Sequence, residues 1–427
     1  MNNILKTLII ATVITLFSGC VNTTSSIKPH EKAFEEEDVY VMFALRAEQV
    51  RSYDNAANIF YNLYERSDKK EYLYRSLQNE LSAQNNQKVI DKVNKITKGS
   101  LDDFALIRLK IIALIGLDKL ESAKDIAVSL VDKSNKVDDY LLVSEIYVKL
   151  KKYNTAVKYL ESAYVKDYNE KILDKMAIVL YVNLDRKKDA IAQLETHSRV
   201  HGCSSLICTR LIGFYSNENN IDGLLSAYLR LYQINSNKEI AEKIVQIYAY
   251  KKDFIKMMDF LEESNSNDEV LLQIYINLKN YKKAYPLAYK LYKKTGETNY
   301  LGQSAIFEYE ASDDNSDKEM QNSVIKKLKK VITRIKEGLY LNYLGYILID
   351  HNLDVKKGME YIQESLRLEP KSSYYLDSLA WGYYKLGDCK NAKKTMDRVI
   401  KLGGGDNEEV KLHVKTINKC SKTKKGK

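Results

Sequence analysis

The segment HSRVHGCSSLIC holds the densest group of potential metal ligands in the sequence. His197 and His201 are four residues apart, so on a helix they would share one face. Cys203 and Cys208 follow at a spacing that zinc could use. The four residues, however, straddle a helix end, a turn and the start of the next helix. We therefore expect no metal here, and either a Cys203–Cys208 disulfide or two unpaired thiols.

The motifs of common enzymes do not occur in the sequence. It contains no G-x-S-x-G, no H-E-x-x-H and no G-x-x-x-x-G-K-[ST]. Gly403-Gly404-Gly405 lacks the following Lys-Ser/Thr of a phosphate-binding loop and stands where one helix must turn into the next. The five histidines are scattered along the chain. We predict a protein without enzymatic activity and without a cofactor.

The composition favours one long helical array over separate globular domains. Only 3 prolines and 17 glycines occur in 427 residues, so few positions interrupt a helix. An apolar fraction of 45% is enough for a continuous core. No Pro-, Ser- or Gly-rich linker divides the chain, although this length normally implies two or three domains.

A pattern of about 34 residues recurs along the chain. YYKLGDCKNAKKTMDRVI, residues 383–400, resembles the tetratricopeptide repeat, in which a small residue lets two helices approach and large residues fill their seam. KLKKYNTAVKYLESA has the same pattern, and further copies centre on Ala56, Ala123, Ala190, Leu224, Met257 and Ala284. Phe254 and Tyr281 are only 27 residues apart, so one unit is shortened. The resemblance implies an all-α, right-handed solenoid of antiparallel helix pairs.

The repeat pattern, together with the features of the chain's start described below, divides the chain into seven segments. We predict a signal peptide (1–19), an anchor and polar tether (20–36), a repeat array (37–298, degenerate over 71–99), a degenerate helical pair (299–337), the two best repeats (338–405), a capping helix (406–420) and a basic tail (421–427).

The start of the chain has the features of a secretory signal. The apolar run from Thr7 to Phe17 follows Lys6 and has about half the ~20 residues needed to span a bilayer. LFSGC resembles the lipobox of bacterial lipoproteins, which implies cleavage before Cys20 and lipid on its sulfur. In the lipoproteins that this segment resembles, a residue other than Asp after the cysteine, here Val21, implies sorting to the outer membrane, facing the periplasm. A short uncleaved anchor is the alternative.

The last two repeats narrow the resemblance. LNYLGY, LEP and LDSLAW are similar to the closing repeats of proteobacterial tetratricopeptide lipoproteins, a group that includes an adaptor of a carboxy-terminal processing protease. The resemblance implies a scaffold or adaptor for envelope proteins, and a processing protease or its substrate is the expected partner. The alternatives are an assembly part of a secretion, pilus or outer-membrane machine, and a lipoprotein that binds a small molecule or peptide. Despite a net charge of +10, nucleic acid is not an expected partner of an exported protein.

The resemblance also implies where a partner binds, because the first helix of each repeat lines the concave face. In the last two repeats the implied groove residues are Asn342, Tyr343, Tyr346, Ile349, Asp350, Tyr374, Asp377, Ser378, Trp381, Tyr384 and Lys385. Aromatic anchors beside polar groups suit an extended peptide. The alternative is that Tyr343 and Trp381 merely pack between neighbouring repeats.

The remaining two cysteines predict a second disulfide. A helix from Cys389 to about Leu402 is followed by NEEVKLHVKTINKC, which reads as a further helix with one apolar face. Neighbouring helices in a solenoid run antiparallel. The first helix runs 13 residues from Cys389 to Leu402 and the second runs back about 14 residues, so Cys420 lies at the level of Cys389. The last helix would then cover the exposed apolar end of the array.

One basic helix has two interpretations. IKKLKKVITRIKEG, residues 325–338, is amphipathic and could contact anionic lipid or wall polymer. We interpret it as a structural helix that packs Val324, Leu328, Val331 and Ile335 inward.

Overall fold

The structure is a computed structural model that describes residues 32–100 and 102–423. These residues form 23 α-helices and no strand, which confirms the all-α prediction. None of the helices in these ranges is both long enough and apolar enough to cross a membrane. The predicted signal peptide and Cys20 lie outside the described residues, so the lipid anchor stays a prediction.

The chain divides into two compact units, Met1–Arg230 and Leu231–Lys427. The first unit contains α2 (Glu37–Gln49), α3 (Tyr53–Ser67), α4 (Lys70–Ser82), α5 (Asn86–Thr97), α6 (Phe104–Gly116), α7 (Leu120–Ser134), α8 (Val137–Lys149), α9 (Tyr153–Asp167), α10 (Glu170–Ile178), the π-helical turn η1 (Val179–Asn183), α11 (Lys187–His201), α12 (Ser205–Asn217) and most of α13 (Ile221–Ile234).

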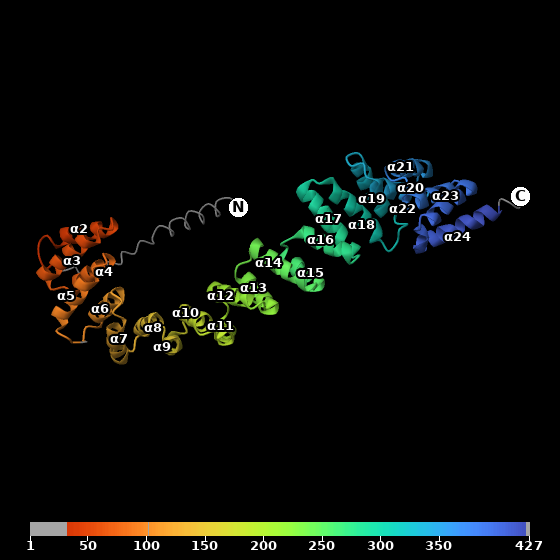
Figure 1. The fold of residues 1–427 in the computed structure, drawn as a ribbon. Helices are drawn as coiled ribbons and strands as arrows, with labels where there is room; N and C mark the ends of the chain where they lie inside the picture. Colours follow the sequence, from red (N-terminus) through yellow and green to blue (C-terminus); the bar gives the residue numbers. More distant parts are fainter. Residues whose placement is uncertain (1–31, 101, 424–427) are drawn as a thin grey trace, which may run out of the picture. The chain divides into compact units, whose positions relative to one another are not determined.

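The second unit contains the end of α13 and the remaining helices, in chain order (Figure 1). They are α14 (Lys238–Lys251), α15 (Phe254–Ser264), α16 (Asp268–Asn277), α17 (Tyr281–Thr295), α18 (Thr298–Glu310), α19 (Lys318–Ile332), α20 (Gly338–Asp350), α21 (Val355–Leu368), α22 (Ser373–Lys385), α23 (Cys389–Lys401), the short 3-10 turn η2 (Gly404–Asp406) and α24 (Glu408–Thr423).

The helices form successive antiparallel pairs, each a first helix and a second helix joined by a short turn. The second helices from α3 to α15 begin every 33 or 34 residues. The turn inside a pair contains a residue with left-handed backbone, such as Lys151 (φ 58°) or Asp118 (φ 56°). The shortened unit arises because α15 and α16 have only 11 and 10 residues.

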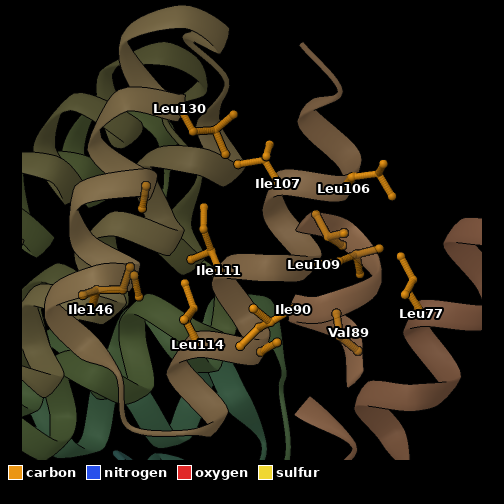
Figure 2. Close-up of a cluster of buried hydrophobic side chains, with 14 of the residues drawn as sticks. Leu77, Val89, Ile90, Leu106, Ile107, Leu109, Ile111, Leu114, Leu130 and Ile146 are labelled. Atoms are coloured by element: carbon orange, nitrogen blue, oxygen red, sulfur yellow. The ribbon is translucent and has the colours of Figure 1, made fainter. Parts of the chain in front are cut away.

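The core is built where first and second helices of adjacent pairs meet. In α6, apolar residues occur on more than one face, and Ile107, Ile111 and Leu114 are buried within a cluster that α5 and α7 share (Figure 2). Each fully buried Leu or Ile contributes about 1.5–3 kcal/mol relative to leaving it exposed. One pair alone would leave part of this apolar surface in water, so the pairs are stable only as a stack.

Charged pairs also join successive repeats of the first unit. The Arg108 guanidinium donates two hydrogen bonds to Asp139, with N–O distances of 2.6 and 2.8 Å. Arg210 binds Asp174 in the same two-pronged way, at 2.6 and 3.0 Å. These carboxylates fix the position of one helix pair along the next, because a planar guanidinium donates two parallel hydrogen bonds to a carboxylate only when the two groups face each other.

Glu37, at the start of α2, is 3% exposed and accepts hydrogen bonds from Lys69 and Tyr72 at 2.6 Å each. Burial alone would raise the pKa of Glu37, but these donors and the Ala33 N–H hold it at about 2. Because this value lies below the unfolded pKa of about 4.3, the charged carboxylate stabilises α2 above about pH 4. We expect the stabilisation, on the order of 2–3 kcal/mol, to be lost as the pH falls toward 2.

Hydrogen exchange of the α2 amides, corrected for intrinsic rates, measures this effect. The parent protein should lose more α2 protection between about pH 5 and pH 2 than Glu37→Gln does. Glu36→Gln, which alters an exposed neighbour, should behave as the parent. Equal pH dependence in the parent and Glu37→Gln would contradict the assignment.

In the second unit, α20 and α21 cross at two glycines. A Cβ atom on Gly345 would lie 2.7 Å from the Gly358 carbonyl oxygen, and one on Gly358 would lie 2.7 Å from the Gly345 oxygen. The two backbones therefore touch. In α19 (Lys318–Ile332), Val324, Leu328 and Val331 are fully buried, as the structural interpretation of the basic helix predicts. The prediction for Ile335 is wrong, because the helix ends at Ile332 and Ile335 is only partly buried in the loop that follows.

The terminal helix α24 packs on α22 and α23, as expected for a cap, and buries Val410 and Ile417. It begins at Glu408 and ends at Thr423, later than the predicted 406 and 420. The delayed start has a local cause, because η2 occupies 404–406 and the Asn407 side chain accepts the Glu409 N–H at 2.9 Å. Cys389 and Cys420 are joined by a disulfide, and so are Cys203 and Cys208.

Candidate functional site

A cavity of about 900 Å³ opens in the second unit, between the first helices α20 and α22 and the cap α24. Helix α18 and nearby loops complete its wall. The lining residues are Tyr309, Glu310, Asn315, Leu339, Asn342, Tyr343, Tyr346, Asp350, Glu369, Ser372, Tyr374, Tyr375, Asp377, Ser378, Trp381, Asn407, Glu409, Val410, Leu412 and His413. A volume of this size falls in the range of ligand-binding pockets.

Eight of the eleven groove residues inferred from the sequence line this cavity, namely Asn342, Tyr343, Tyr346, Asp350, Tyr374, Asp377, Ser378 and Trp381. The prediction for Ile349 is wrong. Ile349 is fully buried, because α20 lies between α21 and α22 and this side chain fills the space beside Gly358 and Gly382. Tyr384 and Lys385 lie outside the lining and support Trp381 from behind.

Each carboxylate of the lining is held by an aromatic side chain. Tyr343 donates to Glu310 at 3.0 Å, Tyr375 donates to Glu369 at 3.1 Å, and Tyr346 donates to Glu409. The Trp381 indole N–H donates to Asp350 at 2.8 Å. His413 Nδ1 lies 3.0 Å from Asp377 Oδ2. Most of these pairs join different helices, so they fix the walls of the cavity to one another.

The tyrosines remain neutral hydroxyl donors. Burial, reinforced by the neighbouring glutamate, raises the pKa of Tyr343 and of Tyr346 far above the ordinary value. Burial and Glu369 raise the pKa of Tyr375 to about 12. A neutral donor occupies part of a carboxylate's hydrogen-bonding capacity without cancelling its charge.

Trp381 is the centre of the aromatic wall. Its ring stacks on His413 with centroids 4.0 Å apart and on Tyr384 at 4.8 Å. Lys385 donates to the Asp350 backbone oxygen at 2.6 Å, and its Nζ lies 5.2 Å from the centre of the Trp381 ring. Trp381 therefore both packs between repeats and lines the cavity, which combines the two alternatives left open by the sequence.

Sequence reasoning missed the wall that α24 provides. Glu409, Leu412 and His413 face the cavity, whereas the sequence indicated only the apolar face of this helix that covers the array. It also missed Tyr309 and Glu310, because the pair containing them fits the repeat pattern poorly. The one available signal was that 409, 412, 413 and 416 form a second helical face beside Val410 and Ile417.

The other cavity near charged residues is a weaker candidate. It has a volume of about 380 Å³ in the first unit and includes Glu37, Lys69 and Arg75 in its lining. Lys69 binds Glu37 there, and Arg75 binds Glu48 with two hydrogen bonds. Because Glu37, Lys69 and Arg75 already have charged partners, these three side chains have little charge left for a ligand.

The HSRVHGCSSLIC segment forms a structural cluster. The sulfurs of Cys203 and Cys208 are bonded to each other. His197 is buried, its ring centre lies 4.8 Å from that of His201 with the rings tilted by 34°, and its Nδ1 lies 2.8 Å from the Tyr164 hydroxyl. Nowhere in residues 32–100 and 102–423 do three or more His, Cys, Asp or Glu side chains gather as a metal site.

The fold and the cavity define an all-α helical-repeat protein with an acidic and aromatic cavity in its second unit. No family model matches the chain, and no curated protein matches it. Among solved structures, the APC/C hetero-tetramer Cut9–Hcn1 matches with TM-score 0.36 and 10% identity over 90% of this chain and 97% of the other.

Two further structures are similar to the same degree. Naa15/Naa10 bound to HypK matches with TM-score 0.35 and 14% identity over 80% of this chain and 64% of the other. A MamA RS-1 double mutant matches with TM-score 0.33 and 16% identity over 40% of this chain and 97% of the other. Likenesses this loose carry no argument about what the chain binds.

Proposed function

We propose that the protein is a non-enzymatic scaffold of the bacterial cell envelope that binds partner proteins in the cavity of its C-terminal unit. The observation that carries the proposal is the cavity itself, where aromatic side chains and fixed carboxylates from four helices line about 900 Å³. Aromatic anchors surrounded by polar groups supply most of the binding energy at protein interfaces.

Lipid on Cys20 would place this scaffold at the outer membrane, facing the periplasm. The support is the LFSGC segment and the polar residues that follow it. An anchored scaffold raises the effective concentration of its partners at the membrane without new contacts. A processing protease or its substrate is the partner that the resemblance of residues 341–388 favours.

A second candidate is a binding protein for a small molecule or free peptide. The volume of the cavity favours it, since pockets of about 300–1,000 Å³ are typical of small ligands. The two candidates differ in what stays bound when the protein is isolated from the envelope.

The test is a crosslinking capture with Cys20→Ser full-length protein as bait. We expect a stoichiometric envelope protein on this bait, and at least about tenfold less of it when Tyr374→Ala and Leu412→Ala are added. Both side chains line the cavity and are exposed by 69% and 59%, so the fold should tolerate the changes.

The matched control replaces Tyr250 and Leu278 by alanine. These two side chains are 75% and 49% exposed and do not line the cavity. This control should retain the partner. A protease on the bait supports the adaptor role, and a machine subunit supports an assembly role. A partner kept equally by both double variants would contradict binding through the cavity, and a co-purified small molecule with no protein would support the second candidate.

A further inference from the structure

The lining of the cavity is acidic, and its one histidine, His413, pairs with Asp377. Glu310, Asp350, Glu369, Asp377 and Glu409 line it, and the lining includes no lysine or arginine. This is the opposite of the chain as a whole, whose net charge is +10. Lys385, outside the lining, has its Nζ 3.7 Å from Asp350, and among the residues that the structure describes it is the one lysine in an ion pair with these five carboxylates.

The negative charge is fixed before a ligand arrives. The hydroxyls of Tyr343, Tyr346 and Tyr375 and the indole of Trp381 are neutral, so they orient the carboxylates without discharging them. Because these donors come from the protein, the carboxylates need little reorganisation when a cation enters, and such preorganisation increases affinity.

The cavity also has acceptor atoms that a hydrogen-bond donor of a ligand could satisfy. Asn342 lines the cavity, and within the part of the chain that the structure describes its Oδ1 has no hydrogen-bond partner. The carboxylates keep acceptor capacity beyond their single aromatic partner. The carboxylates would repel an anionic ligand and attract a cationic one.

The aromatic rings favour the same class of ligand. Trp381, Tyr346 and His413 form one wall of the cavity. The His413 ring stacks on the Trp381 indole, and the Tyr346 ring centre lies 6.5 Å from the His413 ring centre. Tyr374 also lines the cavity and is 69% exposed, and a guanidinium or ammonium group is attracted to the face of such a ring while it pairs with nearby carboxylates.

We propose that the cavity binds an extended basic segment of the partner protein and seats a lysine or arginine side chain of that segment among Asp350, Asp377 and Glu409. The inference rests on the proposed function and adds the chemistry of its partner. The volume of about 900 Å³ exceeds what one side chain fills, so the flanking peptide backbone is bound with it.

The test uses full-length Cys20→Ser protein and four probes: acetyl-Gly-Lys-Ala-Gly-Lys-Ala-Gly-amide, the same peptide with acetyl-lysine, the same peptide with glutamate, and spermidine. Trp381 is the one tryptophan of the chain, so its fluorescence reports binding at this site. We expect the lysine peptide to bind at least about tenfold more tightly than the acetyl-lysine peptide, and more weakly as the ionic strength rises.

The decisive variant combines Glu310→Gln, Asp350→Asn and Glu409→Gln. Each amide keeps an acceptor oxygen for its aromatic donor, so the walls stay in place while three charges are removed. The matched control, Glu360→Gln with Glu364→Gln and Asp397→Asn, removes three charges from α21 and α23, which do not line the cavity. We expect at least about tenfold weaker peptide binding for the first set and less than about twofold for the second.

An equal loss of peptide affinity in the cavity variant and in the control variant would mean that only the net charge of the protein matters, and it would overturn the proposal. Equal affinity for the lysine and acetyl-lysine peptides would also overturn it, as would tighter binding of spermidine, which would identify a small polycation as the ligand. The scaffold role fails separately. If the captured partner is lost with Tyr374→Ala and Leu412→Ala but kept by the charge variant, the scaffold stands and its preference for a cation is wrong.

Discussion

Replacing both Cys389 and Cys420 by alanine should destabilise the C-terminal unit by about 3–4 kcal/mol. The disulfide closes a loop with a sequence separation of 31 residues and ties α24 to α23, so its loss restores conformational entropy to the unfolded chain. Urea unfolding followed by Trp381 fluorescence measures the change, because the one tryptophan lies in this unit.

The same change should impair the binding site. Helix α24 supplies Glu409, Leu412 and His413 to the cavity. Without the disulfide it is held by buried side chains such as Val410 and Ile417 and by the contacts of Glu409 and His413 with α20 and α22. Replacing Cys203 and Cys208 by alanine is the control, since that bridge lies in the other unit and should leave the Trp381 transition unchanged. An unchanged Trp381 midpoint after loss of Cys389 and Cys420 would show that the bridge does not hold the cap.

Gly345→Ala is expected to cost the C-terminal unit about 2 kcal/mol, although alanine is the better helix former. The added Cβ would lie 2.7 Å from the Gly358 carbonyl oxygen and 2.7 Å from Ile362 Cδ1. A backbone oxygen cannot rotate away, so α20 and α21 must separate, and the apolar contacts along their seam weaken with them.

The control for this prediction is Gly405→Ala, in the same unit, where an added Cβ meets nothing within 4 Å. It should shift the Trp381 unfolding transition by less than about 0.5 kcal/mol. A Gly345→Ala protein as stable as the parent would mean that the two backbones are not in contact.

The helical array was accessible from the sequence because its signal is repeated. A small residue such as Ala156, followed by large residues three and four positions on, marks a helix seam, and the same spacing recurs many times. The one irregular pair, α18 and α19, is joined by residues 311–317 instead of a short turn, so its pattern is displaced from the repeat frame. Local propensity also gave no sign of the π-helical turn at Val179–Asn183.

The candidate site was accessible in part. Positions on the first helices, such as Tyr346 and Trp381, follow from the resemblance to the tetratricopeptide repeat, in which the first helix of each unit lines the concave face. Ile349 follows from the same resemblance, but its exposure depends on two distant glycines, Gly358 and Gly382, which no local pattern reveals. The aromatic–carboxylate pairs join residues 6 to 63 positions apart, so their formation depends on how the last helices pack.

The central claim is that a partner protein occupies the cavity of the C-terminal unit. The most direct measurement is hydrogen–deuterium exchange of the full-length Cys20→Ser protein with and without its captured partner. We predict slower exchange in α20, α22 and the first half of α24, which line the cavity, and unchanged exchange in α21 and α23. Slowed exchange confined to helices that do not line the cavity would contradict the claim.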